Sequence, residues 1–299
     1  MKLKFFMFGN CQANPLSRIL MSSNNFSEKF ELIESDYKLS AVHLLESDEQ
    51  SQKRLFQIIE NIDLFIYQNN AASYGEKLST DFLLKMLKPN CLKISFPNSY
   101  YKGYNPETIY LKHNGIIVNR FCDYHDSNVI KDYLLGKSES DVVSSILDIE
   151  YYSNDFIWEN AKNSLSKLRK REIITDINIS DFIEENWTKI KLFHSMNHPT
   201  NLVLLEVADR ILTNLGLPKL NTAERNSHCE EYLGIVHLVI YKSFSKILSF
   251  EFSDEYKIVN GYFSIKDYIH ILFQVYEELG LDPTFRRYLS QLNCQLNWN

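Results

Sequence analysis

The sequence lacks the residue patterns of a secreted or zinc-bound protein. Its 299 residues include five cysteines, which are odd in number, widely spaced and without a C-x-x-C pair: Cys11, Cys91, Cys122, Cys229 and Cys294. This pattern argues against a disulfide framework and against a thiolate zinc site. A reducing cytosol fits it best, so we expect a cytoplasmic protein.

Long apolar runs and a basic surface are also missing. The apolar stretch near the start ends at Gly9, too early for a signal-peptide core, and no stretch approaches the roughly 20 apolar residues of a membrane span. The net charge is −6 and the basic residues are scattered, with the tightest group at 167–171. We therefore expect neither a membrane span nor a nucleic-acid partner, and we interpret the 167–171 group as a solvated helix end rather than a phosphate clamp.

The composition is that of an ordinary globular protein, with 44% hydrophobic and 23% charged residues. Strand-like runs occur at 3–8, 30–33, 39–45, 62–67 and 91–96. Between the last two runs, Ser79 or Thr80 caps an apolar helical pattern that stops at Pro89, which predicts a β-α-β unit. Helix signals then dominate at 127–135, 138–147, 153–171, 180–187, 199–215 and 264–279.

These patterns predict an α/β fold that is mainly helical. We expect a small α/β subdomain with a parallel sheet over residues 1–125, which merges into a predominantly helical region over residues 126–299. No linker rich in Pro, Gly or Ser separates the two regions, so we expect them to share one core and to form a cleft.

The most informative motif is Gly9-Asn10-Cys11-Gln12, which directly follows the first strand-like run. Asn14 as N-cap and Pro15 in the first turn predict a helix that begins within one turn of Cys11. A thiol beside a helix N-terminus is expected to favour the thiolate, and such a turn can bind anions. The alternative is that a lone cysteine near the chain start is a small buried hydrophobic residue.

Polar residues follow two further strands, as Gln68-Asn69-Asn70 and as Pro97-Asn98-Ser99. The carboxyl ends of parallel strands share one sheet edge, so Cys11, Gln12, Gln68 and Asn98 are expected to meet there. The Asn98 amide and the backbone N–H groups near Asn10 and Cys11 then form an oxyanion hole. The alternative for each residue is ordinary turn chemistry.

The segment from Phe193 to Thr200 contains His194 and His198 at the spacing of a helical zinc site. Pro199 disfavours helical geometry at His198, and Ser195 stands where a metalloprotease requires Glu, so we expect no metal. We expect Pro199 to begin the following helix with His198 at its cap, which favours the neutral imidazole of a general base. A capping or core histidine is the alternative.

The stretch Tyr100-Tyr101-Lys102-Gly103-Tyr104 follows Asn98 directly. Its aromatic rings are suited to stacking on an adenine or a sugar, and Lys102 is suited to meeting a phosphate. Simple packing is the favoured interpretation, because the chain contains eighteen tyrosines.

Taken in order, these landmarks resemble the WcbI-like polysaccharide biosynthesis acetyltransferase family of bacterial capsule loci. The resemblance is carried by Gly9-Asn10-Cys11-Gln12, by the strand from Asp63 to Gln68, by Pro97-Asn98 with Tyr104 and Pro106, and by Asn197-His198-Pro199-Thr200-Asn201. They span about two thirds of the chain, and the last eighty residues carry no matching motif.

The resemblance implies a mostly helical fold built on a small α/β subdomain, with coenzyme A in a deep cleft and O-acetylation of a capsular sugar as the activity. Cys11, Gln12, Gln68, Asn98 and His198 would line that cleft. The further candidates for cofactor binding are Gly9, Asn10, Tyr101, Lys102 and Asn197. The arrangement is also distantly similar to SGNH hydrolases, but Ser195 and Met196 stand where those enzymes usually carry the Asp of the triad.

Three functions follow as hypotheses. The leading one is acetyl transfer from acetyl-coenzyme A to a sugar hydroxyl, either directly with His198 or His194 as base and Asn98 holding the oxyanion, or through an acetylated Cys11. The second is an SGNH-type esterase or thioesterase, and the third is a non-catalytic module that binds coenzyme A or glycan. The expected acceptor is a sugar nucleotide, a lipid-linked repeat or a polymer, and association with other polysaccharide-biosynthesis enzymes is a further expectation.

Overall fold

The computed structural model describes residues 2–113, 116–251, 253, 255–259 and 261–281. The chain forms two compact units, each built from several segments. Among the described residues, unit 1 takes those up to Tyr101 together with Asn163–Trp187 and Lys191–Gly234, and unit 2 takes those within Lys102–Lys162, Thr188–Ile190 and from Ile235 to Leu281. The borders of the units therefore differ from the division at residue 125 that the sequence suggests.

Unit 1 is organised around a parallel sheet with the strand order β2-β1-β3-β4. The strands are β1 (Leu3–Phe8), β2 (Phe30–Leu32), β3 (Leu64–Tyr67) and β4 (Leu92–Ser95). All three neighbouring pairs are parallel, with Met7 opposite Ile66 and Ile66 opposite Ile94. Four of the five predicted strands are therefore confirmed, and the strand ends that carry the polar residues lie at the same edge.

The predicted strand at residues 39–45 is wrong. This stretch forms α3 (Tyr37–Ser40) and a 3-10 turn, η1 (Val42–Leu44). The Asp36 side chain caps α3 by accepting the N–H of Lys38 at 3.0 Å. Leu39, Val42 and Leu45 recur every third residue and are all buried, which is a helical spacing that the high content of apolar residues concealed.

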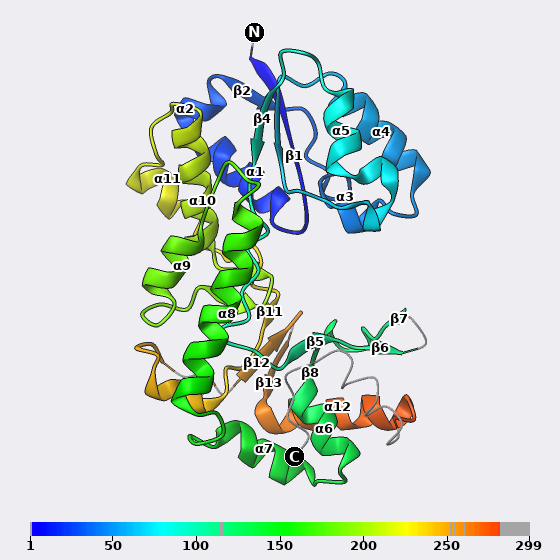
Figure 1. Cartoon of the computed structure of the whole chain (residues 1–299), viewed down its shortest axis with the longest axis vertical. Coiled ribbons are helices and arrows are strands. Elements are labelled where there is room, and N and C mark those ends of the chain that lie inside the picture. Colours follow the sequence, from blue (N-terminus) through cyan, green and yellow to red (C-terminus); the bar gives the residue numbers. More distant parts are fainter. Residues whose placement is uncertain (1, 114–115, 252, 254, 260, 282–299) are drawn as a thin grey trace. The chain divides into compact units, whose positions relative to one another are not determined.

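Helices cover both faces of this sheet (Figure 1). On one side, α4 (Glu49–Ile59) and α5 (Thr80–Met86) pack against Phe6, Phe8 and Phe65 of the sheet. On the other side lie α1 (Ala13–Ser22) and α10 (Asn201–Asn214), which pack against each other. The helix α5 connects β3 to β4 and is capped by Ser79, so the predicted β-α-β unit is confirmed.

The other elements of unit 1 are short, except for the long helix α8, whose C-terminal part belongs to this unit. They are α2 (Asn24–Ser27), η2 (Ala72–Tyr74), η3 (Glu76–Leu78), the end of α8 (Asn154–Glu172), α9 (Ser180–Asn186), β9 (Phe193–Ser195), β10 (His198–Pro199) and α11 (Thr222–Asn226). The predicted helices at 153–171 and 180–187 are confirmed to within one residue at each end.

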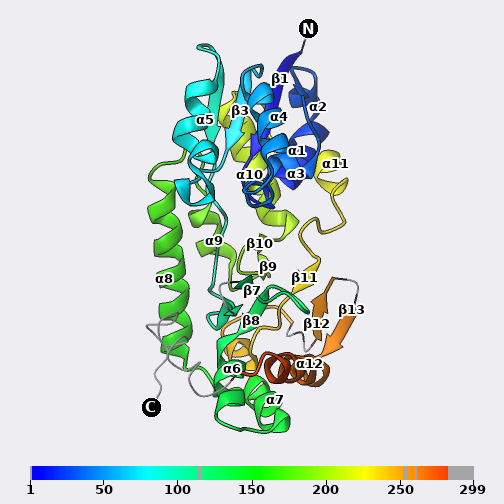
Figure 2. The ribbon, with the colours of Figure 1, turned by 90° about the vertical axis from the view of Figure 1, so that its right-hand side faces the viewer.

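Unit 2 combines helices with small antiparallel sheets. The helices are α6 (Ser127–Leu134), α7 (Glu139–Leu147), α12 (Ile265–Glu278) and the 3-10 helix η4 (Lys242–Lys246), and the strands are β5 (Thr108–Tyr110), β6 (Lys112–His113), β7 (Ile116–Ile117), β8 (Tyr124–Asp126), β11 (Val236–His237), β12 (Glu255–Ile258) and β13 (Gly261–Ser264). Figure 2 shows α12 beside β13, and α12 also contacts β12, α6 and α7. The β11-β12-β13 sheet was not predicted from the sequence, because short edge-like strands with few apolar residues leave a weak pattern. Across the described ranges, no helix combines the length and the apolar character that a bilayer crossing requires.

Candidate functional site

The turn after β1 requires a glycine because a glutamine side chain packs directly on it. A Cβ atom at Gly9 would lie 2.6 Å from Oε1 of Gln68, which is closer than real Cβ contacts allow. The same Gln68 oxygen accepts the backbone N–H of Asn10 at 2.8 Å. Gly9 and Gln68 therefore fit together as one unit that joins the ends of β1 and β3.

Gln12 is the centre of the site. It is fully buried, and its Nε2 donates to Oδ1 of Asn98 at 3.2 Å, to the Ser99 carbonyl at 3.1 Å and to the Asn197 carbonyl at 2.9 Å. Its Oε1 accepts from Nε2 of Gln68 at 3.2 Å and from the backbone N–H of Ser99 at 3.1 Å. One amide side chain thus joins the loops after β1, β3 and β4 to the segment that carries His198.

This confirms that the polar residues after the three strands meet at one sheet edge. The backbone groups of Ser99 and the backbone carbonyl of Asn197 also bond to Gln12. A sequence pattern does not reveal backbone contacts of this kind.

The start of α1 differs from the expectation. The N-cap is Gln12, which makes no side-chain capping bond, and Asn14 lies inside the helix with its amide donating to the Ser35 carbonyl at 3.3 Å. The predicted Asn14 cap is therefore wrong, because the helix already begins at Ala13. Oδ1 of Asn10 closes the turn before the helix by accepting the N–H of Gln12 at 2.9 Å. Pro15 does lie in the first helical turn.

Cys11 is half-buried and does not favour the thiolate. Burial raises its pKa to about 11, although its own backbone N–H acts in the opposite direction. The expectation of an activated thiolate is therefore wrong for this arrangement. Removal of the sulfur from water raises the thiol pKa by more than the nearby helix N-terminus lowers it. At neutral pH Cys11 is a thiol.

The expected oxyanion hole is only partly present. The backbone N–H of Asn10 is already bonded to Gln68, so it is not available to a ligand. Asn98 accepts the Gln12 hydrogen bond through Oδ1, which leaves its Nδ2 as the donating side of the amide. Asn98 and the backbone at Cys11 remain the candidate donors.

The segment around the two histidines forms a small antiparallel pair, with His198 of β10 opposite Ser195 of β9. The helix α10 begins at Asn201 with Thr200 as its N-cap. The predictions that Pro199 begins this helix and that His198 caps it are therefore wrong, because Pro199 is extended and pairs with Phe193. Burial, and then the charge of His194, lower the pKa of His198 to about 4, so its ring is neutral at neutral pH.

His194 is buried and is held by a carboxylate that the sequence did not reveal. Its Nε2 lies 3.0 Å from Oε2 of Glu231, and the same oxygen accepts the N–H of Asn201 at 2.7 Å. The Asn201 side chain fixes the loop that carries Glu231, because it donates to the carbonyls of His228 and Glu230 and accepts the N–H of Tyr232. A carboxylate in hydrogen-bond contact with a residue 37 positions earlier leaves no local sequence signal.

Tyr101 and Lys102 have different surroundings from the rest of the set. Tyr101 is 1% exposed and its ring packs on those of Phe193 and Trp187, with centroids 5.3 Å and 6.4 Å away. A ligand cannot stack on a ring that protein side chains cover, so the assignment of Tyr101 to cofactor stacking is wrong and packing accounts for it. Lys102 belongs to unit 2, where its carbonyl accepts the Asn160 amide at 2.9 Å, and its pairing with a phosphate stays a prediction.

No group of three or more His, Cys, Asp or Glu residues is arranged to hold a metal ion within the described ranges. The cysteines at 11, 91, 122 and 229 are free thiols, and Cys294 lies outside the described residues.

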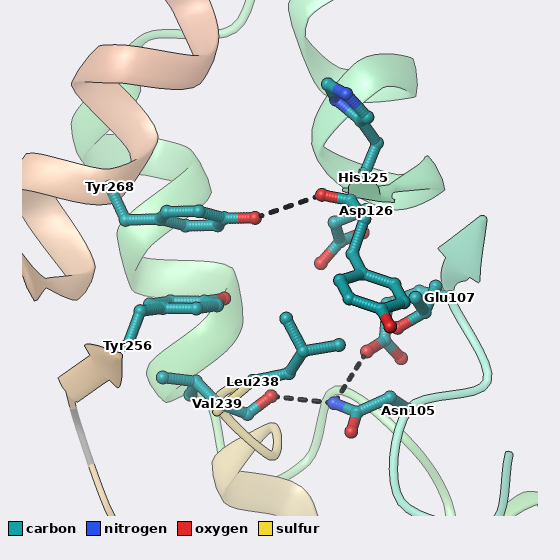
Figure 3. A pocket seen from close by; sticks show the side chains of 10 residues that line it. Asn105, Glu107, His125, Asp126, Leu238, Val239, Tyr256 and Tyr268 are labelled. Atoms are coloured by element: carbon teal, nitrogen blue, oxygen red, sulfur yellow. Dashed lines mark hydrogen bonds between the residues drawn. The ribbon is translucent and has the colours of Figure 1, made fainter. Parts of the chain in front are cut away.

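A second polar cluster lies in unit 2, around a cavity of about 10 Å³ that has room for roughly one water molecule (Figure 3). Two buried carboxyl groups line it, Glu107 and Asp126. Asp126 accepts the Tyr241 hydroxyl at 2.8 Å and caps α6, and Glu107 accepts the Asn105 amide at 3.1 Å. Burial is the largest cause that raises the pKa of Glu107 to about 8 and that of Asp126 to about 6.

The comparisons with known proteins bear on both the fold and the family. A solved structure described as WcbI, a novel polysaccharide biosynthesis enzyme, aligns with a TM-score of 0.82 and 22% identity, over 100% of this chain and 97% of that chain. It is the native protein without a disulfide bond between coenzyme A and one of its cysteines. The alignment confirms the α/β fold. No match is found among curated proteins.

The family model described as the polysaccharide biosynthesis enzyme WcbI matches residues 4–220. The matched range contains the whole Gln12-centred site with Gln68, Asn98 and both histidines, whereas Glu231 lies beyond it. The chain therefore belongs to the WcbI family of polysaccharide biosynthesis enzymes.

Proposed function

We propose that this protein transfers an acetyl group from acetyl-coenzyme A to a sugar hydroxyl during polysaccharide biosynthesis. The observation that carries the proposal is the Gln12 side chain, which bonds to Asn98 and to the Asn197 carbonyl next to His198. An amide donor and a neutral imidazole are thereby held at the carboxyl edge of a parallel sheet, where ligands of α/β proteins bind. The family assignment restricts the chemistry to polysaccharide biosynthesis.

Coenzyme A as the acyl carrier is supported by the description of the similar structure, which names this molecule and a cysteine of that protein. In the present chain, the edge offers the Cys11 thiol, the donating side of the Asn98 amide and the tight backbone turn at Gly9. Neutral donors of this kind suit a thioester carbonyl, which develops negative charge on its oxygen during acyl transfer. We therefore place the acyl end of the donor at this edge.

The direct route needs a base for the sugar hydroxyl. As the C–O bond to the sugar forms and the C–S bond of the thioester breaks, the hydroxyl proton passes to an imidazole and the sulfur leaves as a thiolate that is then protonated. His198 has the required neutral form, although its pKa of about 4 makes it a weak base. His194, with the Glu231 carboxylate at its Nε2, is the second candidate.

Replacement of Cys11 by Ala is expected to leave most of the acetyl transfer intact. The raised pKa of the thiol leaves almost no thiolate at neutral pH, and the thiolate is the form that a covalent route requires. We expect turnover within about threefold of the wild type, measured as thiol release that depends on a sugar acceptor. Cys91→Ala, at a buried cysteine just before β4, is the matched control.

A loss of roughly 1,000-fold or more in the Cys11→Ala enzyme, with Cys91→Ala active, would establish the covalent route instead. Intact-mass measurement of the wild type after brief exposure to acetyl-coenzyme A gives the complementary readout, since an acetylated Cys11 adds a fixed mass that the direct route does not produce.

Hydrolysis is the second candidate function, because Glu231 and His194 form a carboxylate–imidazole pair like the one that a hydrolase triad contains. The sequence lacks an acid directly before His198, and the carboxylate of Glu231, from a distant loop, contacts His194 instead. Rapid thiol release from acetyl-coenzyme A without any acceptor would favour an esterase or thioesterase. Release that rises strongly when sugar nucleotides, lipid-linked repeats or polymer are added supports the transferase and identifies its acceptor class.

A further inference from the structure

The C-terminal end of α8 and the loop after it lie across the carboxyl ends of β3 and β4. In this loop, the N–H groups of Asp176 and Ile177 donate to the Ser95 carbonyl at 3.1 Å, and the Asn69 amide donates to the Ile174 carbonyl at 3.0 Å. Ser95 ends β4 and Asn69 follows Gln68. The last turn of α8 is thus held at the same sheet edge as the Gln12-centred site.

Arg171, in that last turn, is directed to this edge. Its Nη2 donates to the Tyr100 carbonyl at 3.0 Å, and its guanidinium carbon lies 5.7 Å from the centre of the Tyr100 ring. Tyr100 in turn donates its N–H to the Asn98 carbonyl and its hydroxyl to the Met196 sulfur. Arg171 therefore contacts the loop that carries Asn98, within the network that ends at Gln12.

No carboxylate forms an ion pair with Arg171 among the described residues, although the charge of the adjacent Glu172 acts on the guanidinium. The adjacent Glu172 carboxylate accepts hydrogen bonds from the N–H groups of Ile179 and Ser180 and from the Ser180 hydroxyl. The Asp176 carboxylate accepts hydrogen bonds from the backbone N–H and the hydroxyl of Ser95. The Nε of Arg171 is shielded from solvent and has no acceptor in this part of the chain.

The other basic residues of the same helix end are different. Lys167, Arg169 and Lys170 are exposed, and Arg169 forms an ion pair with Glu184. The interpretation of a solvated helix end fits these three residues. Arg171 is half-buried, and burial is the main cause that lowers its pKa. A half-buried guanidinium with unused donors is costly unless an anion completes it.

We propose that Arg171 binds a phosphate or pyrophosphate group, which under the proposed function is that of coenzyme A. The guanidinium fork matches phosphate oxygens with two parallel N–H donors, and its attachment to the Tyr100 carbonyl and ring leaves it oriented before a ligand arrives. The inference rests on the proposed function only for the identity of the molecule that carries the phosphate.

The test compares coenzyme A with pantetheine, which keeps the thiol arm and lacks the phosphates. Isothermal titration of the full chain is expected to show coenzyme A binding at least tenfold weaker in Arg171→Met than in the wild type, and pantetheine binding within twofold. Arg171→Lys, which keeps the charge but loses the fork, is expected to lie between the two. Arg169→Met is the matched control, since it removes one positive charge from the same helix end, and it should bind coenzyme A as the wild type does.

The outcomes separate the inference from the proposed function. Unchanged coenzyme A affinity in both Arg171 variants, or an equal loss for coenzyme A and pantetheine, would overturn the phosphate assignment. Inorganic pyrophosphate provides an arm that does not depend on coenzyme A, because it should raise the melting temperature of the wild type and of Arg169→Met but not of Arg171→Met. If the wild type responds to pyrophosphate and not to coenzyme A, the anion site stands and the donor assignment fails. Absence of a pyrophosphate response and of coenzyme A binding in the wild type would contradict both.

Discussion

Replacement of Gln12 by Leu is expected to lower the free energy of unfolding by about 3 kcal/mol or more and to abolish ligand binding at the sheet edge. Leucine fills a similar volume, so the loss comes from polar atoms rather than from a cavity. The amide of Gln68, the Asn197 carbonyl and both backbone groups of Ser99 would lose a buried partner at once. Each unsatisfied buried group costs roughly 1–3 kcal/mol, and these costs do not add fully because the groups share one network.

Urea denaturation of the two proteins measures this loss. Gln57→Leu is the matched control, since it makes the same chemical change on the exposed face of α4 and is expected to shift stability by no more than about 0.5 kcal/mol. If Gln12→Leu unfolds at the same urea concentration as Gln57→Leu, Gln12 does not organise the site in the way described.

Replacement of Glu107 by Gln is expected to make the protein more stable than the wild type at alkaline pH. Glu107 is buried beside Asp126, and its pKa is raised from 4.5 to about 8, first by burial and then by the charge of Asp126. The folded protein therefore keeps a proton that the unfolded chain releases above pH 4.5. This contribution to stability is fully present below pH 4.5 and is lost as the pH rises to about 8.

The wild type should accordingly lose on the order of 3–5 kcal/mol of stability between pH 5 and pH 9 through this group. Glutamine has the shape of the protonated acid and can still accept the Asn105 amide, so the variant should show much less of this loss. The measurement is the melting temperature of both proteins from pH 5 to pH 9. Glu159→Gln, at an exposed acid of α8 in the same unit, should follow the wild-type profile, and a Glu107→Gln profile parallel to it would refute the assignment.

The parts of the fold that were predictable are those with strong local signals. The strand at 3–8 is a run of apolar residues ended by Gly9, and the helix at 264–279 has a capping Ser264 and a terminal Gly280, so the bounds in the structure, Leu3–Phe8 and Ile265–Glu278, lie close to those expected. The stretch at 39–45 failed because apolar residues in a short segment do not show whether their period is two or three.

The site shows a similar division. The meeting of Gln12, Gln68 and Asn98 was predictable, because each follows a strand and parallel strands bring their carboxyl ends to one edge. Glu231 and Arg171 were not predicted. Glu231 contacts His194 from a loop 37 residues further along the chain, and Arg171 belongs to a basic cluster whose other members are exposed. The position of Cys11 beside a helix N-terminus suggested a thiolate, but burial raises its pKa and keeps it a thiol.

The central claim is that the edge around Gln12 binds coenzyme A, and the most direct measurement is the melting temperature of the wild-type chain with and without this ligand. A molecule that binds only the folded state must stabilise it, by about 2.7 kcal/mol at a concentration one hundred times its dissociation constant. We predict a rise of several degrees at millimolar coenzyme A, and no rise in Gln12→Leu under the same conditions. An unchanged melting temperature of the wild type at that concentration would contradict the account.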